Sequence, residues 1–227
     1  MKNRSVLVVA SHPDDEVLGC GGTIAKHCAE GASVAILFMA DGVGSRGVQM
    51  VNQPDCNQRR EAAKSACGLL GATDLTFLPY PDNQLDQVPL LALTQEVEKT
   101  VNRLRPEIVY THHCGDVNVD HRRTHDAVIT ACRPQPGFPV KRLLFFEIAS
   151  STEWSPPNSH RPFEPQCFND ISAFLEVKLK ALKLYGSEVR PYPHPRSIEA
   201  VEYLTRWRGA TVGVMAAEAF ELGRELI

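Results

Sequence analysis

The sequence lacks the features that define several large classes of protein. No apolar run approaches the ~20 residues that a membrane-spanning helix needs, so we expect no membrane span. The formal net charge is -3 and the pI is about 6.2, which gives no electrostatic attraction to nucleic acid or to an anionic membrane. Internal repeats, low-complexity tracts and linkers are also absent. A chain of 227 residues with these properties fits one domain, residues 1–227.

A disulfide framework is a further feature that the sequence lacks. The seven cysteines are an odd number, are scattered, and include no CxxC pair. This usage is typical of a reducing compartment, so we expect a cytoplasmic protein. The N-terminus resembles a signal peptide only faintly, because the apolar run at 5–10 is short and acidic residues follow where a cleavage site needs small ones. We expect a first β-strand there.

Short apolar runs rich in β-formers alternate with segments of helical periodicity, which predicts an α/β fold. The expected strands are 6–10, 34–39, 75–78, 107–112 and 142–148. The expected helices are 16–30, 56–70, 90–104, 121–132, 170–185 and a C-terminal stretch interrupted at Gly209, with Asp55 and Asp120 as N-caps. This order predicts a three-layer, Rossmann-like fold with a mainly parallel sheet flanked by helices. We expect residues from about 150 to 227 to contribute loops and helices that cover a substrate.

Polar clusters follow three of the expected strands. They are His12-Pro13-Asp14-Asp15-Glu16 after the first, Asp41-Gly42 with Ser45-Arg46 after the second, and the segment 112–121 after the fourth. Ligands of open parallel sheets bind at the carboxyl ends of the strands. We therefore expect these clusters to form one site at that edge of the sheet.

The first cluster has a structural explanation and a functional one. Taken alone, His12 fits a hydrogen-bonded core histidine, and Asp14 or Asp15 fits a helix cap. Capping leaves unexplained the histidine, the proline that fixes the turn, and a second His/Asp cluster at another strand end. Two histidines and one carboxylate, with a position open for water, form a catalytic zinc site. An adjacent carboxylate that does not bind the metal can take the proton of that water.

Three segments of the sequence resemble the PIG-L/LmbE family of zinc-dependent sugar de-N-acetylases. They are Ser11-His12-Pro13-Asp14-Asp15-Glu16, Gly21-Gly22-Thr23 and Asp116-Val117-Asn118-Val119-Asp120-His121-Arg122. Weaker matches at 41–46, 81–83, 150–154 and 217–220 extend the resemblance over most of the chain. The resemblance implies a hydrolase acting on linear amides. Its expected substrate is an N-acetylated sugar of the N-acetylglucosamine type, as a conjugate or a nucleotide sugar, from which a metal-activated water releases acetate and a free amine.

The resemblance also implies a metal site. By position, His12, Asp15 and His121 bind the metal, which we expect to be Zn²⁺, although Fe²⁺ suits the same ligands. Asp14 is then the general base that activates the water. Asp120, next to a ligand, is expected to anchor a ligand from behind or to cap the helix.

The proton donor for the leaving amine is less clearly marked. Family members often carry a histidine three residues before the last ligand, and this chain has Asn118 there. An asparagine can donate a hydrogen bond to an oxyanion but cannot donate a proton to an amine. Protonated Asp14, His113 and His194 are the alternatives for that step.

Several further residues are candidates for binding substrate. Arg46, Arg59 and Asp82 suit sugar hydroxyls or a phosphate, and solvated surface charge explains Arg59 equally well. His113 lies within the third cluster. His194 and Arg196 lie in a Pro-bracketed loop that can reach over the site from the C-terminal part, or that is simply exposed.

Two other functions fit the same residues. One is a metal hydrolase that acts on a non-sugar amide or acyl group. The other is a catalytically idle protein that binds a sugar or a metal, which Asn118 favours. Asp14 argues against idleness, because ligand binding alone needs no second carboxylate there. The expected partner is a small-molecule substrate, and a homo-oligomer is compatible with the sequence.

Overall fold

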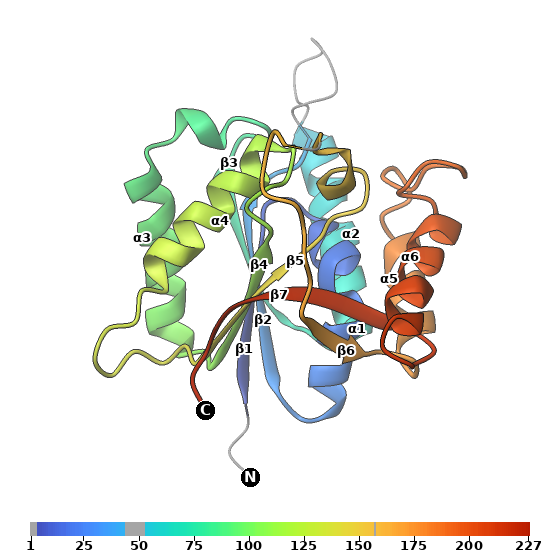
Figure 1. Ribbon diagram of the computed structural model, residues 1–227. Helices are drawn as coiled ribbons and strands as arrows, with labels where there is room; N and C mark the ends of the chain where they lie inside the picture. Colours follow the sequence, from blue (N-terminus) through green and yellow to red (C-terminus); the bar gives the residue numbers. More distant parts are fainter. Residues whose placement is uncertain (1–3, 44–52, 157) are drawn as a thin grey trace.

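The computed structural model describes residues 4–43, 53–156 and 158–227, which form one seven-stranded sheet between two layers of helices (Figure 1). The strands are β1 (Ser5–Ala10), β2 (Ser33–Ala40), β3 (Asp74–Tyr80), β4 (Ile108–His112), β5 (Arg142–Phe146), β6 (Cys167–Asp170) and β7 (Ala217–Glu225). The helices are α1 (Asp15–Ala29), α2 (Gln53–Leu70), α3 (Leu90–Leu104), α4 (Val119–Ala131), α5 (Leu175–Lys183) and α6 (Ile198–Ala210). Within the described ranges, no helix is long and apolar enough to cross a membrane.

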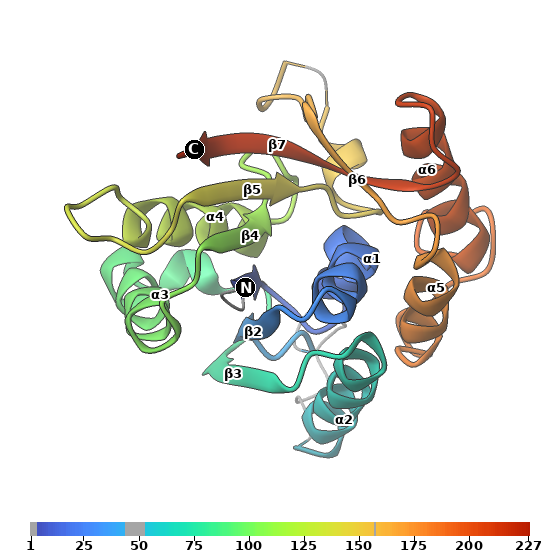
Figure 2. The same cartoon turned by 90° about the horizontal axis from the view of Figure 1, so that it is seen from below.

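The sheet is mainly parallel, as the sequence predicts. Its strand order is β3-β2-β1-β4-β5-β7-β6. The first five strands of this order run parallel to one another, and β7 pairs antiparallel with both β5 and β6. Helices α1, α2, α5 and α6 lie on one face, and α3 and α4 cover the other (Figure 2).

Strand β1 shows why this sheet is buried on both faces. Val6 and Val8 belong to the apolar core beneath α1, α2 and α5, whereas Leu7 and Val9 belong to the core beneath α3 and α4. Successive side chains of a strand point to opposite faces. A continuous apolar run therefore marks a strand with helices on both sides. The polar residues that follow it lie beyond the carboxyl end of the strand.

The expected C-terminal helix is wrong beyond Ala210. Residues 217–225 form β7, and the side chains from Ala217 to Glu221 are buried. The chain turns back close to α6, since a Cβ on Gly209 would lie 2.7 Å from the Cα of Ala216. Alanine and glutamate favour helix, but pairing with strands on both sides outweighs that local preference here.

Both expected N-caps are also corrected. Helix α4 begins at Val119, and its N-cap is Asn118, whose side-chain oxygen accepts a hydrogen bond from the Asp120 amide at 2.8 Å. Asp120 therefore lies in the first turn. Helix α2 begins at Gln53, so Asp55 lies within the helix rather than before it.

Candidate metal centre and active site

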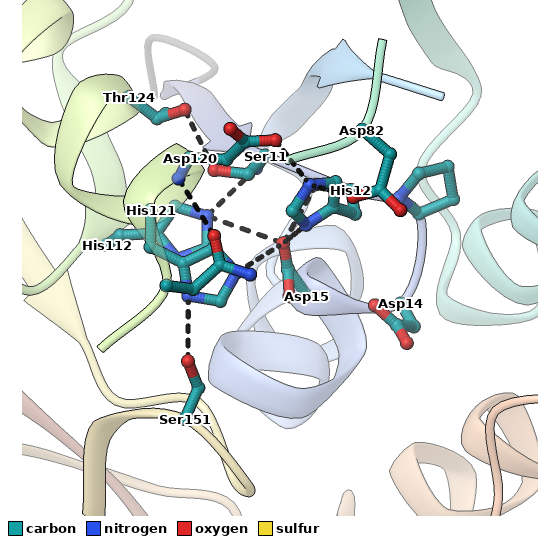
Figure 3. A network of polar contacts seen from close by, with 12 residues as sticks. Ser11, His12, Asp14, Asp15, Asp82, His112, Asp120, His121, Thr124 and Ser151 are labelled. Carbon is teal, nitrogen blue, oxygen red and sulfur yellow. Dashed lines mark hydrogen bonds and ion pairs between the residues drawn. The ribbon is translucent and has the colours of Figure 1, made fainter. Parts of the chain in front are cut away.

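The two main polar clusters meet where the strand order changes direction. From β1 the chain proceeds outward to β2 and β3, then returns to place β4 and β5 on the other side of β1. Such a switch point leaves a crevice at the carboxyl ends of the central strands. The cluster that follows β1 and the cluster that follows β4 lie together there (Figure 3).

His12, Asp15 and His121 form a buried group with metal-ligand geometry. One ligand atom from each residue lies within 4.8 Å of the others. The Oδ2 atom of Asp15 lies 3.4 Å from His12 Nδ1 and 3.4 Å from His121 Nε2. Two nitrogens and one carboxylate oxygen are a donor set that zinc accepts.

Two atoms of this group need a partner that the described residues do not supply. Asp15 Oδ1 and His121 Nε2 are buried and have no hydrogen-bond partner in the described part of the chain. Leaving a buried polar atom unsatisfied is costly. Burial lowers the pKa of His121, but the charges of Asp116 and Asp15 outweigh it and raise the pKa to about 9. The same negative field attracts a cation, so the residues fit a divalent ion.

His12 is oriented by a carboxylate behind it. Its Nε2 lies 2.9 Å from Asp120 Oδ2 and 3.0 Å from Asp82 Oδ1, which leaves Nδ1 facing Asp15. Backbone amides of Asn83 and Leu85 donate to the two oxygens of Asp120 at 2.7 and 2.9 Å and hold the carboxylate in place. Such a carboxylate fixes the ring and the tautomer of a metal-binding histidine.

His121 has an equivalent partner that sequence reasoning missed. Its Nδ1 lies 3.1 Å from Asp116 Oδ1. Asp116 also accepts hydrogen bonds from the Ser151 hydroxyl, the Thr152 hydroxyl and the Asn118 amide. Burial raises the pKa of Asp116, but the charge of His121 and the hydrogen bonds outweigh it and hold the pKa below the usual range. Asp116 is part of the motif that carried the family resemblance, but nothing in its spacing shows that it faces His121.

His112 supports His121 from the other side. The two rings stack with centroids 4.1 Å apart and an interplanar angle of 19°. The Ser11 amide donates to His112 Nε2 at 2.8 Å, so this nitrogen carries no proton and the ring is neutral. Burial, reinforced by the charge of His121, lowers the pKa of His112. His112 is therefore a neutral ring that packs against His121, and its Nε2 already accepts the hydrogen bond from Ser11.

Asp14 lies beside the metal-ligand group and contacts two arginines. Its Oδ2 lies 3.1 Å from Arg59 Nη2 and 3.1 Å from Arg196 Nη1. Its Oδ1 is buried and makes no hydrogen bond to the described residues. Burial raises the pKa of Asp14, while the two guanidinium groups act in the opposite direction. One oxygen of this carboxylate is thus anchored and the other is available.

The backbone at Asp14 is strained and is held by Glu16. Asp14 has a φ of 124°, which non-glycine residues rarely adopt. Its amide donates to Glu16 Oε2 at 3.0 Å, and the Tyr185 hydroxyl donates to Glu16 Oε1. Burial raises the pKa of Glu16 to about 7, against the opposing hydrogen bond from Tyr185. Glu16 thus anchors the turn that aims Asp14, a role that sequence reasoning did not assign.

A pocket of about 240 Å³ opens beside this group. His12, Asp14 and Asn118 line it together with residues of the C-terminal part of the chain, among them Trp154 and Arg196. The Asn118 side-chain oxygen is engaged in capping α4. Its amide nitrogen is therefore the atom left to donate into the pocket.

The residues expected to bind substrate differ in placement. Arg59, Asp82 and His194 line the pocket. His113 is buried elsewhere, with Nδ1 2.6 Å from Glu221 Oε2 and Nε2 2.8 Å from the Arg161 carbonyl oxygen. Both ring nitrogens are thus engaged away from the pocket. Arg46, with the neighbouring Ser45, lies outside the described residues.

A mainly parallel sheet flanked by helices, with a buried His₂Asp group and an adjacent carboxylate at its switch point, is the architecture of a metal-dependent hydrolase. Comparison with known proteins gives the family. The family model "PIG-L: GlcNAc-PI de-N-acetylase" matches residues 7–132. The chain is also 30% identical over 198 residues, covering 83% of each protein, to the probable N-acetyl-alpha-D-glucosaminyl L-malate deacetylase 2 of Bacillus anthracis. The chain belongs to the PIG-L family of deacetylases, which are hydrolases that act on amides.

Solved structures show the same fold over nearly the whole chain. A conserved protein of Thermus thermophilus aligns with a TM-score of 0.76 and 30% identity, covering 98% of this chain and 96% of that one. The N,N'-diacetylchitobiose deacetylase of Pyrococcus horikoshii, complexed with an inhibitor, aligns with a TM-score of 0.79 and 24% identity, covering 97% and 84%. The expected family and fold are confirmed.

Proposed function

We propose that the protein removes the acetyl group from an N-acetylated sugar conjugate of the N-acetylglucosamine type, with His12, Asp15 and His121 holding a catalytic divalent ion. The observation that carries the proposal is the buried ligand group with unsatisfied atoms beside Asp14, a carboxylate outside that group. The names of the relatives support the substrate class, since they include a probable N-acetyl-alpha-D-glucosaminyl L-malate deacetylase and a diacetylchitobiose deacetylase.

Zinc is the ion we propose, because two imidazoles and one carboxylate are a common set of ligands for catalytic zinc. Fe²⁺ suits the same donors and is the alternative. A divalent ion bound there would lower the pKa of a water and polarise an acetyl carbonyl. Asp120 and Asp116 would hold the ligand histidines in orientation through His12 Nε2 and His121 Nδ1.

Asp14 Oδ1 accepts the proton of the attacking water in this proposal. The water oxygen forms a bond to the acetyl carbon, and the amide nitrogen of Asn118 donates a hydrogen bond to the resulting oxyanion. Protonated Asp14 then returns the proton to the nitrogen as the carbon–nitrogen bond breaks, giving acetate and a free amine. His113 is engaged elsewhere. Nδ1 of His194 accepts a hydrogen bond from the Arg196 amide at 3.0 Å. These contacts favour Asp14 as base and acid.

The pocket lining supports a sugar as the bound molecule. Asp82, Asn83 and Ser150 offer polar atoms for hydroxyl groups, and the ring of Trp154, which is 52% exposed, offers an apolar face. Trp154 and Ser150 belong to the part from 150 to 227 that we expect to cover the substrate.

None of the seven cysteines, all in the described ranges, forms a disulfide, which supports the proposed cytoplasmic location.

Acetate release from a defined panel tests the proposal. The purified protein is stripped of metal with a chelator, reloaded with Zn²⁺ or Fe²⁺, and assayed on N-acetylglucosamine conjugates with neutral and anionic aglycones, nucleotide sugars and simple acetamides. We expect release from a sugar conjugate that the chelator abolishes and the metal restores. Hydrolysis confined to the simple acetamides favours the non-sugar hydrolase, and metal binding without any acetate release favours the idle binding protein.

A further inference from the structure

Arg196 reaches the catalytic carboxylate from the far end of the chain, 182 residues after Asp14. We propose that Arg196 is a positioning residue that, together with Arg59, fixes Asp14 so that only Oδ1 faces the reacting water. The proposal rests on the proposed function, because it assumes that Asp14 moves the proton.

Both guanidinium groups bind the same oxygen of Asp14. Arg59 Nη2 and Arg196 Nη1 each lie 3.1 Å from Oδ2. Two donors that converge from different elements restrict rotation about the bond between the side-chain methylene and the carboxylate carbon. The two oxygens of Asp14 are therefore not interchangeable, and the unpartnered Oδ1 is the one presented for proton transfer.

The two arginines that bind Asp14 are anchored by different parts of the structure. Arg59 lies on α2, and its Nε donates to the Pro13 carbonyl oxygen at 2.8 Å, so it is tied to the same turn as Asp14. The Nε of Arg196 donates to the Ser150 hydroxyl at 2.6 Å, in the segment that follows β5. Arg196 thus connects Asp14 to a second, independent part of the pocket wall.

The loop that carries Arg196 is well fixed. Arg196 directly precedes Ser197, the N-cap of α6, whose hydroxyl accepts from the Ala200 amide at 3.0 Å. The Arg196 amide donates to His194 Nδ1 at 3.0 Å, and the Ser197 amide donates to the His194 carbonyl at 2.8 Å. A guanidinium group carried by such a fixed loop holds its position, as a residue that positions a catalytic group must.

Charge balance explains why two arginines do not simply neutralise the base. Glu188 pairs with Arg59 and lies 3.8 Å from Arg196, so two carboxylates share two guanidinium groups. Each guanidinium group is therefore attracted to two carboxylates rather than to Asp14 alone. The contacts fix the orientation of Asp14, while part of the attraction of both arginines is directed at Glu188.

The test compares Arg196→Ala with Arg208→Ala as a matched control. The two side chains are similarly exposed, at 23% and 22%, and each pairs with a carboxylate, but Arg208 pairs with Glu147 rather than with Asp14. We expect Arg196→Ala to bind zinc as the wild type does and to lose roughly 10- to 100-fold in kcat with little change in KM, as misplacement of a catalytic group does. Arg208→Ala should keep the wild-type kcat.

Chemical rescue separates positioning from a general structural effect. Guanidinium ion added below denaturing concentrations should raise the kcat of Arg196→Ala and leave Arg208→Ala unchanged. Arg196→Lys should fall between the wild type and Arg196→Ala, because an ammonium keeps the charge but not the two-pronged geometry.

Three results overturn the proposal, and they are distinguishable. An unchanged kcat in Arg196→Ala removes the positioning role. A raised KM with unchanged kcat makes Arg196 a substrate contact instead. Loss of kcat that guanidinium does not restore, or loss of bound zinc, makes the residue merely structural. A wild-type protein that releases no acetate from any substrate overturns the proposed function itself, together with this role.

Discussion

Replacing Asp116 by asparagine isolates the contribution of the carboxylate behind His121. The change keeps the shape of a side chain that is 1% exposed and removes its charge. The Asn118 amide and Ser151 hydroxyl donate to Oδ1, while the Thr152 hydroxyl donates to Oδ2. An asparagine can keep its oxygen at the Oδ1 position and place its NH₂ group against Thr152, whose hydroxyl can rotate to accept. We therefore expect the fold to survive.

The expected effect is on metal affinity. Without the negative charge 3.1 Å from Nδ1, His121 becomes a weaker ligand. Removing such a carboxylate weakens metal binding by about 10- to 100-fold, which corresponds to about 1.4–2.8 kcal/mol of binding free energy. Zinc titration against a competing chelator measures this change directly.

Glu221→Gln is the matched control. Glu221 is also a buried carboxylate on the Nδ1 of a histidine, at 2.6 Å from His113, but His113 belongs to no metal-ligand group within the described residues. We expect Glu221→Gln to leave the zinc Kd unchanged. Equal zinc affinity in Asp116→Asn and the wild type, or equal weakening in both variants, would show that Asp116 does not strengthen His121 as a ligand.

Two further predictions concern stability. Burial lowers the pKa of His113 and raises the pKa of Glu221, but the contact between the two groups outweighs both effects. The pKa of His113 is therefore above 6.5 and the pKa of Glu221 below 4.5. The stability from His113 is lost as pH rises through its folded pKa, and the stability from Glu221 is lost as pH falls through its own folded pKa. Glu221→Gln should therefore lose the most unfolding free energy, measured by urea unfolding, between about pH 4.5 and 6.5. A loss that is independent of pH contradicts this prediction. Gly22→Ala should cost about 1–2 kcal/mol of unfolding free energy, because its Cβ would lie 2.4 Å from Ile171 Cδ1. Gly68→Ala, with open space around the Cβ, should be neutral or stabilising, and equal losses in the two variants would contradict the packing argument.

The meeting of the two polar clusters could be predicted from the sequence. Apolar runs followed at once by His12 and by His112 imply neighbouring strand ends, and a parallel sheet brings such ends together. The helical periodicity of α3 likewise follows from its spacing of leucine and valine. These features depend on local pattern and on one topological rule.

The surroundings of the site could not be predicted in this way. The contacts of Asp116 with Ser151 and of Asp14 with Arg196 join loops 35 and 182 residues apart, whose paths no local pattern specifies. Arg59 lines the pocket, but its contact with Asp14 has no signal in the sequence, because only the fold shows how α2 packs against the turn after β1. Strand β7 was missed for a similar reason, since its conformation depends on pairing with β5 and β6.

In the proposed mechanism Asp14 moves the proton while His12, Asp15 and His121 hold the metal. The kcat for acetate release by Asp14→Ala, carrying the same zinc content as the wild type, separates these two roles. We predict a loss of roughly 10²- to 10⁴-fold, the usual contribution of a general base. A zinc-loaded Asp14→Ala protein that deacetylates at the wild-type rate would show that Asp14 is not the general base.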